Sequence, residues 1–310
     1  MAKQRLIKPL FVSLFPIIVF VSVLLIITVV FILRKMYFAK NEGFTNTNAN
    51  ANTNNIAIVS MIKNPKNLDT WLQKHRDLGI AQFYIRLEQT PDLESFLEMQ
   101  PDVYVKIGES SGVNEYKEIQ TRQNAWVNEA LKLAKDDGMS WLIHIDSDEI
   151  LEGDLDSIRN LPESTRTFWM QNLEAKYKDI PKSQDNCFVA AKYVNCAKPD
   201  PGETCVSYAN GKAGGRCAPD VSSFGPHRFK SNQWGNPDPK LDDVVVHHYE
   251  SCDFEQYKAK YKNLAKQDLA NDIPFTYYTE SIKAVLEGND EALERVYTKY
   301  RLVETSRFPL

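Results

Sequence analysis

Three carboxylates follow an apolar run near the middle of the chain. Residues 141–145 read Trp-Leu-Ile-His-Ile, and Asp146, Asp148 and Glu149 come directly after them. Side chains on a strand alternate between its two faces, so Asp146 and Asp148 can point to the same side of a sheet. Ligands of open α/β sheets bind at the carboxyl ends of the strands. We therefore expect a functional site where this strand ends.

Two carboxylates that lie side by side repel each other unless a cation lies between them. Mg²⁺ or Mn²⁺, bound by one or two carboxylates and completed by phosphate oxygens, is a common arrangement in enzymes. Asp146 and Asp148 are therefore candidate ligands of a divalent metal ion that also binds a nucleotide diphosphate. The alternative is a surface Asp-Ser-Asp turn that caps the next helix.

The surrounding sequence indicates a sheet with helices on its faces. Short apolar runs alternate with helical segments from residue 56 onward, a pattern typical of βαβ units and a mostly parallel sheet. Strands are expected at 56–61, 82–87, 103–107, 141–146, 165–173 and 243–249, and helices at 114–135, at 253–269 and in two short C-terminal segments. The resulting fold class is α/β, with the acidic run at one edge of the sheet.

The N-terminal part of the chain has a different composition. Residues 10–33 contain no charged side chain. At ~1.5 Å rise per residue such a run can cross a ~30 Å hydrocarbon core, and its length favours an uncleaved membrane anchor over a signal peptide. Residues 34–55 are rich in Asn and Thr and are interpreted as a stalk. We therefore expect a tail at 1–9, an anchor, a stalk and a catalytic domain at 56–310.

Charge and cysteine usage narrow the partners and the compartment. The net charge of -4 gives no electrostatic case for nucleic acid as a partner. All five cysteines lie in the second half of the chain, at spacings that do not fit a zinc ribbon. They are compatible with disulfides that pin a loop in an oxidising compartment, or with free thiols.

Residues 141–151 resemble the Asp-x-Asp signature of GT-A-fold glycosyltransferases, especially the family 2-like and family 92-like enzymes. Two further stretches are similar to these families: 63–79, with its Asn, Trp, His and Gly, and 246–258, with its His-His-Tyr. Together the matches cover most of 56–266. The resemblance implies a GT-A-like, Rossmann-like domain that binds a nucleotide sugar as its donor.

The resemblance also implies a ligand set for the metal ion. Asp148, with Asp146, would hold the ion at the donor diphosphate, and His248 or His247 would complete the coordination. An imidazole beside carboxylates favours Mn²⁺ over Mg²⁺.

Further donor contacts follow from the same resemblance. The residues at the family's positions are Gln120, Lys212, Arg216 and His227. Lys212 and Arg216 would neutralise the leaving diphosphate. The chain departs from the family pattern at Pro65 and at Glu88, and Glu88 is expected to reach the base or the ribose.

A transfer that inverts the anomeric centre requires a general base, usually a carboxylate near the acceptor. Glu149, Glu174 and Asp220 are the candidates for this base, and the sequence does not choose among them.

The sequence thus predicts a metal-dependent glycosyltransferase that moves a sugar from a nucleotide-diphosphate sugar to a hydroxyl of a glycan or glycoprotein. Anchor, stalk and downstream domain match a single-pass type II membrane protein whose catalytic domain lies in the Golgi or ER lumen. One alternative is a membrane-anchored carbohydrate-binding protein with this fold and no turnover. Another is a Mg²⁺-dependent phosphohydrolase, although such enzymes usually carry an Asp nucleophile after their first strand.

Overall fold

The computed structural model describes residues 54–108, 116–182, 185–205, 208–233, 235–266 and 275–303. The expected anchor at 10–33 lies outside these ranges. The expected stalk also lies outside them, except for its last two residues. Within them, no helix is both long and apolar enough to cross a membrane. The fold described below is that of the compact unit that begins at Asn54.

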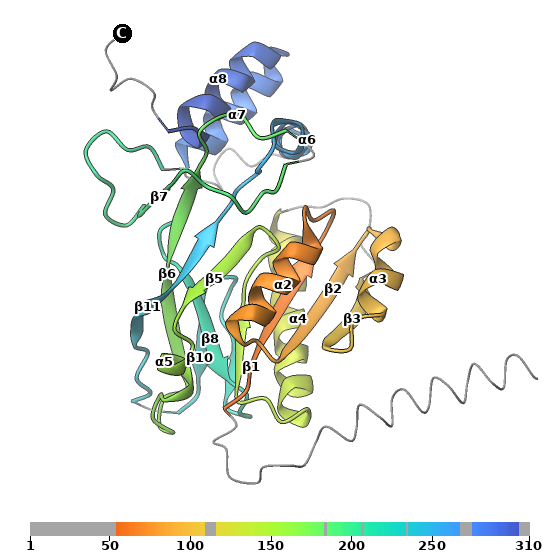
Figure 1. Cartoon of the computed structure of the whole chain (residues 1–310), viewed down its shortest axis with the longest axis vertical. Helices are drawn as coiled ribbons and strands as arrows, with labels where there is room; N and C mark the ends of the chain where they lie inside the picture. The colour runs from red at the N-terminus through yellow and green to blue at the C-terminus, as the bar shows by residue number, and fades with distance from the viewer. Residues whose placement is uncertain are drawn as a thin grey trace, which may run out of the picture. The chain divides into compact units, whose positions relative to one another are not determined.

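A mixed β-sheet forms the centre of this unit (Figure 1). Among the described residues it has nine strands, in the order β3-β2-β1-β4-β8-β6-β11-β5, with β7 beside β6. Their bounds are β1 Ile56–Ile62, β2 Gln82–Glu88, β3 Val103–Gly108, β4 Trp141–His144, β5 Glu149–Gly153, β6 Thr167–Lys176, β7 Lys192–Val194, β8 Lys212–Arg216 and β11 Lys240–His248. A separate hairpin is formed by β9 Val221–Ser223 and β10 Phe229–Ser231.

The sheet is parallel in only one half, which corrects the expectation of a mostly parallel sheet. Strands β3, β2, β1 and β4 run parallel to one another. Beyond them, β8 is antiparallel to both β4 and β6, and β5 is antiparallel to β11, while β6 and β11 are parallel. Only residues 145–148 join β4 to β5. A parallel connection needs a dozen residues or more, so β5 cannot lie parallel beside β4.

Helices cover both faces of the parallel half. The helices are α2 Leu68–Leu78, α3 Glu94–Glu98, α4 Tyr116–Asp136, α5 Asp156–Arg159, α6 Phe254–Leu264, α7 Thr276–Leu286 and α8 Asp290–Arg301, with a short 3-10 turn at Pro91–Leu93. Alternate residues of β1 belong to different cores: Ile58 packs in the cluster that contains Trp71 of α2, and Val59 in the cluster that contains Trp126 of α4. The alternation follows from the two-residue period of a strand.

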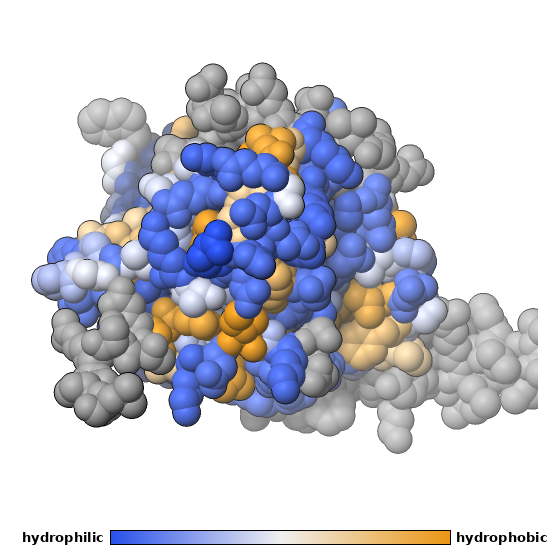
Figure 2. Space-filling view, turned by 90° about the horizontal axis from the view of Figure 1, so that it is seen from above, coloured by the Kyte–Doolittle hydropathy of each residue, from blue (hydrophilic) through white to orange (hydrophobic). Residues whose placement is uncertain are grey.

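A third buried cluster joins the C-terminal helices. Tyrosines dominate it, and its members include Tyr257 and Tyr261 of α6, Tyr277 of α7 and Tyr297 of α8. On the face seen in Figure 2, hydrophilic residues predominate, with several patches of apolar residues between them. The buried apolar side chains of the described residues thus form three clusters, two on the faces of the sheet and one among the C-terminal helices.

Most of the expected elements are present within a few residues. The expected strand at 141–146 ends earlier, at His144, because the backbone N–H of Asp146 is taken by the side chain of Glu149 at 2.7 Å. The long central helix is described from Tyr116, so the start expected at 114 lies outside the described residues. The helix expected at 253–269 ends at Leu264, and the residues after 266 are likewise outside the described ranges.

Two disulfides hold the loops around β7. They join Cys187 to Cys252 and Cys196 to Cys205, while Cys217 is a free thiol. The Cys187–Cys252 bridge ties the loop after β6 to the segment that follows β11. For four of the five cysteines the disulfide alternative is therefore the one that the structure supports.

Candidate functional site

A cavity of about 880 Å³ lies where β4 and β11 end. Its floor comes from the residues just after these two strands, one wall from α4, and another wall from α6 and the start of α7. The lining residues are Ile119, Gln120, Gln123, Asp146, Asp148, Tyr208, Ala209, Asn210, Pro226, His227, His248, Glu250, Lys260, Leu264, Phe275 and Tyr278. The cavity therefore opens at the edge of the sheet that the acidic run predicts.

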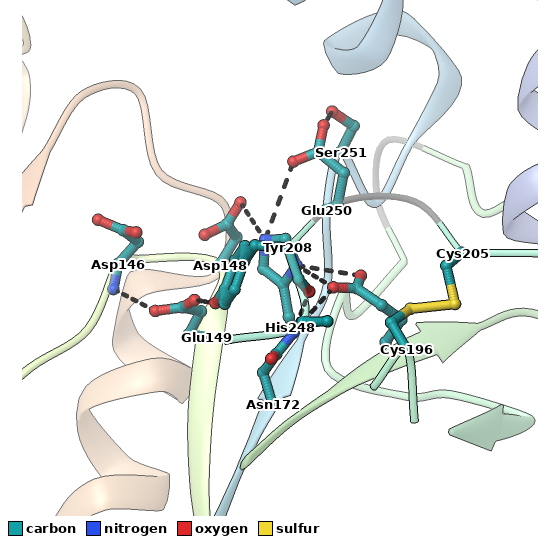
Figure 3. A network of polar contacts seen from close by, with 12 residues as sticks. Asp146, Asp148, Glu149, Asn172, Cys196, Cys205, Tyr208, His248, Glu250 and Ser251 are labelled. Carbon is teal, nitrogen blue, oxygen red and sulfur yellow. Dashed lines mark hydrogen bonds and ion pairs between the residues drawn. A yellow bond between two sulfur atoms is a disulfide. The ribbon is translucent and has the colours of Figure 1, made fainter. Parts of the chain in front are cut away.

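Three side chains in the cavity present ligand atoms to a common point. One ligand atom from each of Asp148, His248 and Glu250 lies within 4.8 Å of the other two. His248 Nε2 is 3.7 Å from Asp148 Oδ2 and 3.9 Å from Glu250 Oε2 (Figure 3). Two carboxylates and an imidazole form a donor set that suits Mn²⁺ and similar divalent ions. These residues fit a divalent metal ion.

Glu250 was not among the ligands expected from the sequence. It follows His248 by two residues at the end of β11, and residues two apart in an extended chain can face the same side. The His-x-Glu spacing at the end of an apolar strand is thus the sequence feature from which Glu250 could have been predicted as a ligand. His247 faces the other way and does not line the cavity. Its ring stacks on the ring of Tyr193, and the two ring centres are 3.7 Å apart. Of the two histidines, the structure places His248 at the site.

Glu174 of β6 holds the ring of His248 from behind. Its carboxylate oxygens are 2.8 and 3.0 Å from His248 Nδ1, so the Nδ1–H donates to Glu174 and Nε2 is left facing the cavity. Glu174 is fully buried, accepts from Asn172 Nδ2 at 3.3 Å and lies 3.6 Å from Arg301 Nη1. A carboxylate that orients a ligating histidine in this way is typical of protein metal sites.

The expectation that Glu174 is a general base is therefore not supported by its position. It is buried behind His248 and is not part of the cavity lining. Burial lowers the pKa of His248, but the Glu174 and Asp148 carboxylates outweigh this effect and hold the pKa well above its usual value.

We expect Glu174→Gln to weaken Mn²⁺ binding by about 10- to 100-fold, because the carboxylate that orients His248 is lost. The affinity can be measured by electron paramagnetic resonance of free Mn²⁺, with thermal melting to check the fold. Glu152→Gln is the matched control, since Glu152 is 65% exposed and lies beside His247 on the other face. Equal Mn²⁺ affinities of Glu174→Gln and the wild type would contradict the orienting role.

Asp146 lines the cavity but is held by a buried lysine. Its Oδ2 is 2.6 Å from Lys212 Nζ, and its Oδ1 accepts from Gln123 Nε2 at 3.2 Å. Burial opposes ionisation of Asp146, yet Lys212 keeps the pKa of this carboxyl below its usual range. Asp146 is also outside the group that faces a common point. Of the two aspartates expected as metal ligands, Asp148 is therefore the one that faces His248.

Glu149 braces the turn between β4 and β5. It is fully buried, lies 3.1 Å from Lys212 Nζ and accepts hydrogen bonds from the Tyr208 hydroxyl and from the backbone N–H of Asp146. Its backbone carbonyl accepts from Trp71 Nε1 at 2.7 Å. Glu149 does not line the cavity. Its position fits a structural support of the metal site and does not support the expected role as a general base.

Three other expected residues lie away from the cavity. Arg216 is at the opposite end of β8 from Lys212, with its guanidinium 4.2 Å from the ring centre of Trp141. Asp220 accepts a hydrogen bond from Ser231 Oγ at 2.7 Å, in the hairpin. Glu88 is 3% exposed and lies between two arginines. The structure gives each of them partners other than a ligand, so their expected donor or catalytic roles are not supported.

Gln120 and His227, two of the residues expected to contact the donor, line the cavity. His227 Nδ1 is 2.9 Å from the carbonyl oxygen of Gly211, which can only accept, so the proton of the ring is on Nδ1. Burial lowers the pKa of His227 to about 3, and its ring is therefore neutral. The structure thus brings Gln120, His227, Asp146, Asp148 and His248 to one cavity.

The fold and this cavity define an α/β protein with a candidate site for a divalent metal ion. No family model matches the chain. Two proteins of Arabidopsis thaliana, both described as glycosyltransferase-like, are similar to it. One is 22% identical, with 61% of this chain and 52% of that protein covered. The other is 23% identical, with 58% of this chain and 43% of that protein covered.

The chain therefore spans about half the length of the curated relatives it matches. These relatives agree with the broader resemblance to glycosyltransferases, while the narrower one, to family 2-like or family 92-like enzymes, stays a prediction.

Solved structures give weaker similarity. HddC from Yersinia pseudotuberculosis is 9% identical, with 63% of this chain and 78% of that chain covered and a TM-score of 0.28. Rv0371C from Mycobacterium tuberculosis H37Rv, solved in complex with manganese, is 9% identical, with 66% and 97% covered and a TM-score of 0.30. TM-scores this low support no inference about the activity or the ligands of the present chain.

Proposed function

We propose that the chain is a metal-dependent glycosyltransferase that uses a nucleotide-diphosphate sugar as its donor. The observation that carries this proposal is the convergence of Asp148, His248 and Glu250 in a cavity at the carboxyl edge of the sheet. Similarity to two glycosyltransferase-like proteins supports it independently of the cavity. Mn²⁺ is the proposed ion, with Mg²⁺ as the alternative, because an imidazole is one of the three ligands.

Each part of the site has a defined task in this proposal. Asp148, His248 and Glu250 hold the ion, and Glu174 and Arg301 behind them keep His248 in one orientation. The bound ion would supply positive charge next to the diphosphate that leaves the sugar, which is the main electrostatic requirement of such a transfer.

The acceptor and the location of the protein are further parts of the proposal. We take the acceptor to be a hydroxyl of a glycan or glycoprotein, and the chain to be anchored through 10–33 with its catalytic domain in the Golgi or ER lumen. Two disulfides are in keeping with an oxidising compartment.

Thermal melting of the full chain in detergent, with a panel of nucleotide sugars, tests the proposal. We expect one nucleotide class to raise the melting temperature in the presence of Mn²⁺ and not in its absence. A ligand present at about 100 times its dissociation constant adds roughly 2.7 kcal/mol to the free energy of unfolding, so the shift should be clear. A response to free sugars and to no nucleotide would instead favour a carbohydrate-binding protein without turnover.

A further inference from the structure

Lys260 of α6 reaches the cavity beside the proposed metal ligands. Its ammonium is 2.7 and 2.8 Å from the two oxygens of Glu250 and 3.4 Å from the hydroxyl of Tyr278. The side chain is 36% exposed and is part of the cavity lining, whereas Glu250 is 2% exposed. Lys260 therefore shares a carboxylate with the metal site and keeps one side open to a ligand.

The other basic residues considered so far cannot fill this place. Lys212 is fully buried behind Asp146, and Arg216 lies at the far end of β8. Among the described residues that line the cavity, Lys260 is the one that carries an ammonium or a guanidinium group. Among these described lining residues, Lys260 is therefore the lysine or arginine that can contact an anionic ligand in the cavity.

The charges of the cavity indicate an anion beside Lys260. A divalent ion held by Asp148 and Glu250 would offset the negative charge of Glu250, the carboxylate that Lys260 contacts. The ion and the ammonium of Lys260 would then place positive charge side by side in the cavity. Such a cavity attracts an anion.

We infer that Lys260 binds the diphosphate of the nucleotide-sugar donor, next to the metal ion. The inference rests on the proposed function and adds to it the side chain that contacts the phosphate. An ammonium that remains partly exposed can donate to a phosphate oxygen while it keeps its hydrogen bond to Glu250, because it has three donors. Lys260 takes the role that the sequence assigned to Lys212 and Arg216.

Nucleotide binding to the full chain at saturating Mn²⁺ tests the inference. UDP and GDP are compared with UMP and GMP by isothermal titration calorimetry, in the wild type, Lys260→Met and Lys260→Arg. Lys262→Met is the matched control, because Lys262 lies on the same helix, is 51% exposed and does not line the cavity. Mn²⁺ binding without nucleotide is measured separately for each variant by electron paramagnetic resonance.

We expect Lys260→Met to lose about 10- to 100-fold in affinity for the diphosphate, the range of one charge-assisted hydrogen bond. Its affinity for the monophosphate and for Mn²⁺ alone should not fall, and Lys260→Arg should keep most of the diphosphate affinity. Wild-type diphosphate affinity in Lys260→Met would overturn the inference, as would an equal loss for diphosphate and monophosphate, or a loss of Mn²⁺ binding. If the wild type binds Mn²⁺ but binds none of the four nucleotides, the proposed function itself is wrong, and the inference is wrong with it.

Discussion

Asp148→Asn is expected to abolish Mn²⁺-dependent sugar transfer and to weaken Mn²⁺ binding by more than about 100-fold, beyond the range for residues that only orient a ligand. Asp148 is one of the three residues whose ligand atoms meet in the cavity, and asparagine removes its charge with little change in shape. The fold should survive, because Asp148 is 40% exposed and lies in the short connection between β4 and β5. Electron paramagnetic resonance, melting and a transfer assay with the donor found by the nucleotide-sugar panel provide the three measurements.

Two further variants make the result specific. Asp146→Asn should weaken Mn²⁺ binding far less, because Asp146 is paired with Lys212 and lies outside the ligand group. Asp242→Asn, at an aspartate that is 82% exposed, should leave both metal binding and transfer unchanged. If Asp148→Asn binds Mn²⁺ as tightly as the wild type does, the metal site proposed here is wrong.

Lys212→Met is expected to have the largest effect on stability, lowering the free energy of unfolding by about 3–5 kcal/mol, the usual cost of breaking a buried ion pair. Lys212 is fully buried, 2.6 Å from Asp146 and 3.1 Å from Glu149. Without the ammonium, Glu149 keeps its place in the core with its main counter-charge removed. The loss follows from that uncompensated charge, since methionine fills nearly the same volume.

Urea denaturation of the wild type and Lys212→Met measures this effect. Lys240→Met is the control: Lys240 is 40% exposed and pairs with an exposed aspartate, so its loss should cost about 0–1 kcal/mol. Adding Glu149→Gln to Lys212→Met should recover part of the lost stability, because it removes the unpaired carboxylate. A loss below about 1 kcal/mol for Lys212→Met would mean that water or other groups satisfy Glu149 there.

The sequence by itself determined the elements that position the site. Apolar periodicity placed the strands 56–61 and 82–87 and the central helix, and the acidic run after a buried strand marked the edge where the cavity lies. These features are local: they depend on side-chain alternation along one strand or one helix, which a single sequence displays directly. The anchor and the stalk are local predictions too, and they stay predictions.

Only the tertiary structure decided which side chains meet. Glu174 is 74 residues from His248 in the chain, yet β6 and β11 are neighbours in the sheet, and this pairing makes Glu174 the residue that orients the histidine. Lys212 reaches Asp146 across 66 residues because β8 lies antiparallel beside β4. Lys260 enters the cavity because α6 follows β11 there. Strand order and direction arise from long-range packing, which leaves no signal in the spacing of residues along the chain.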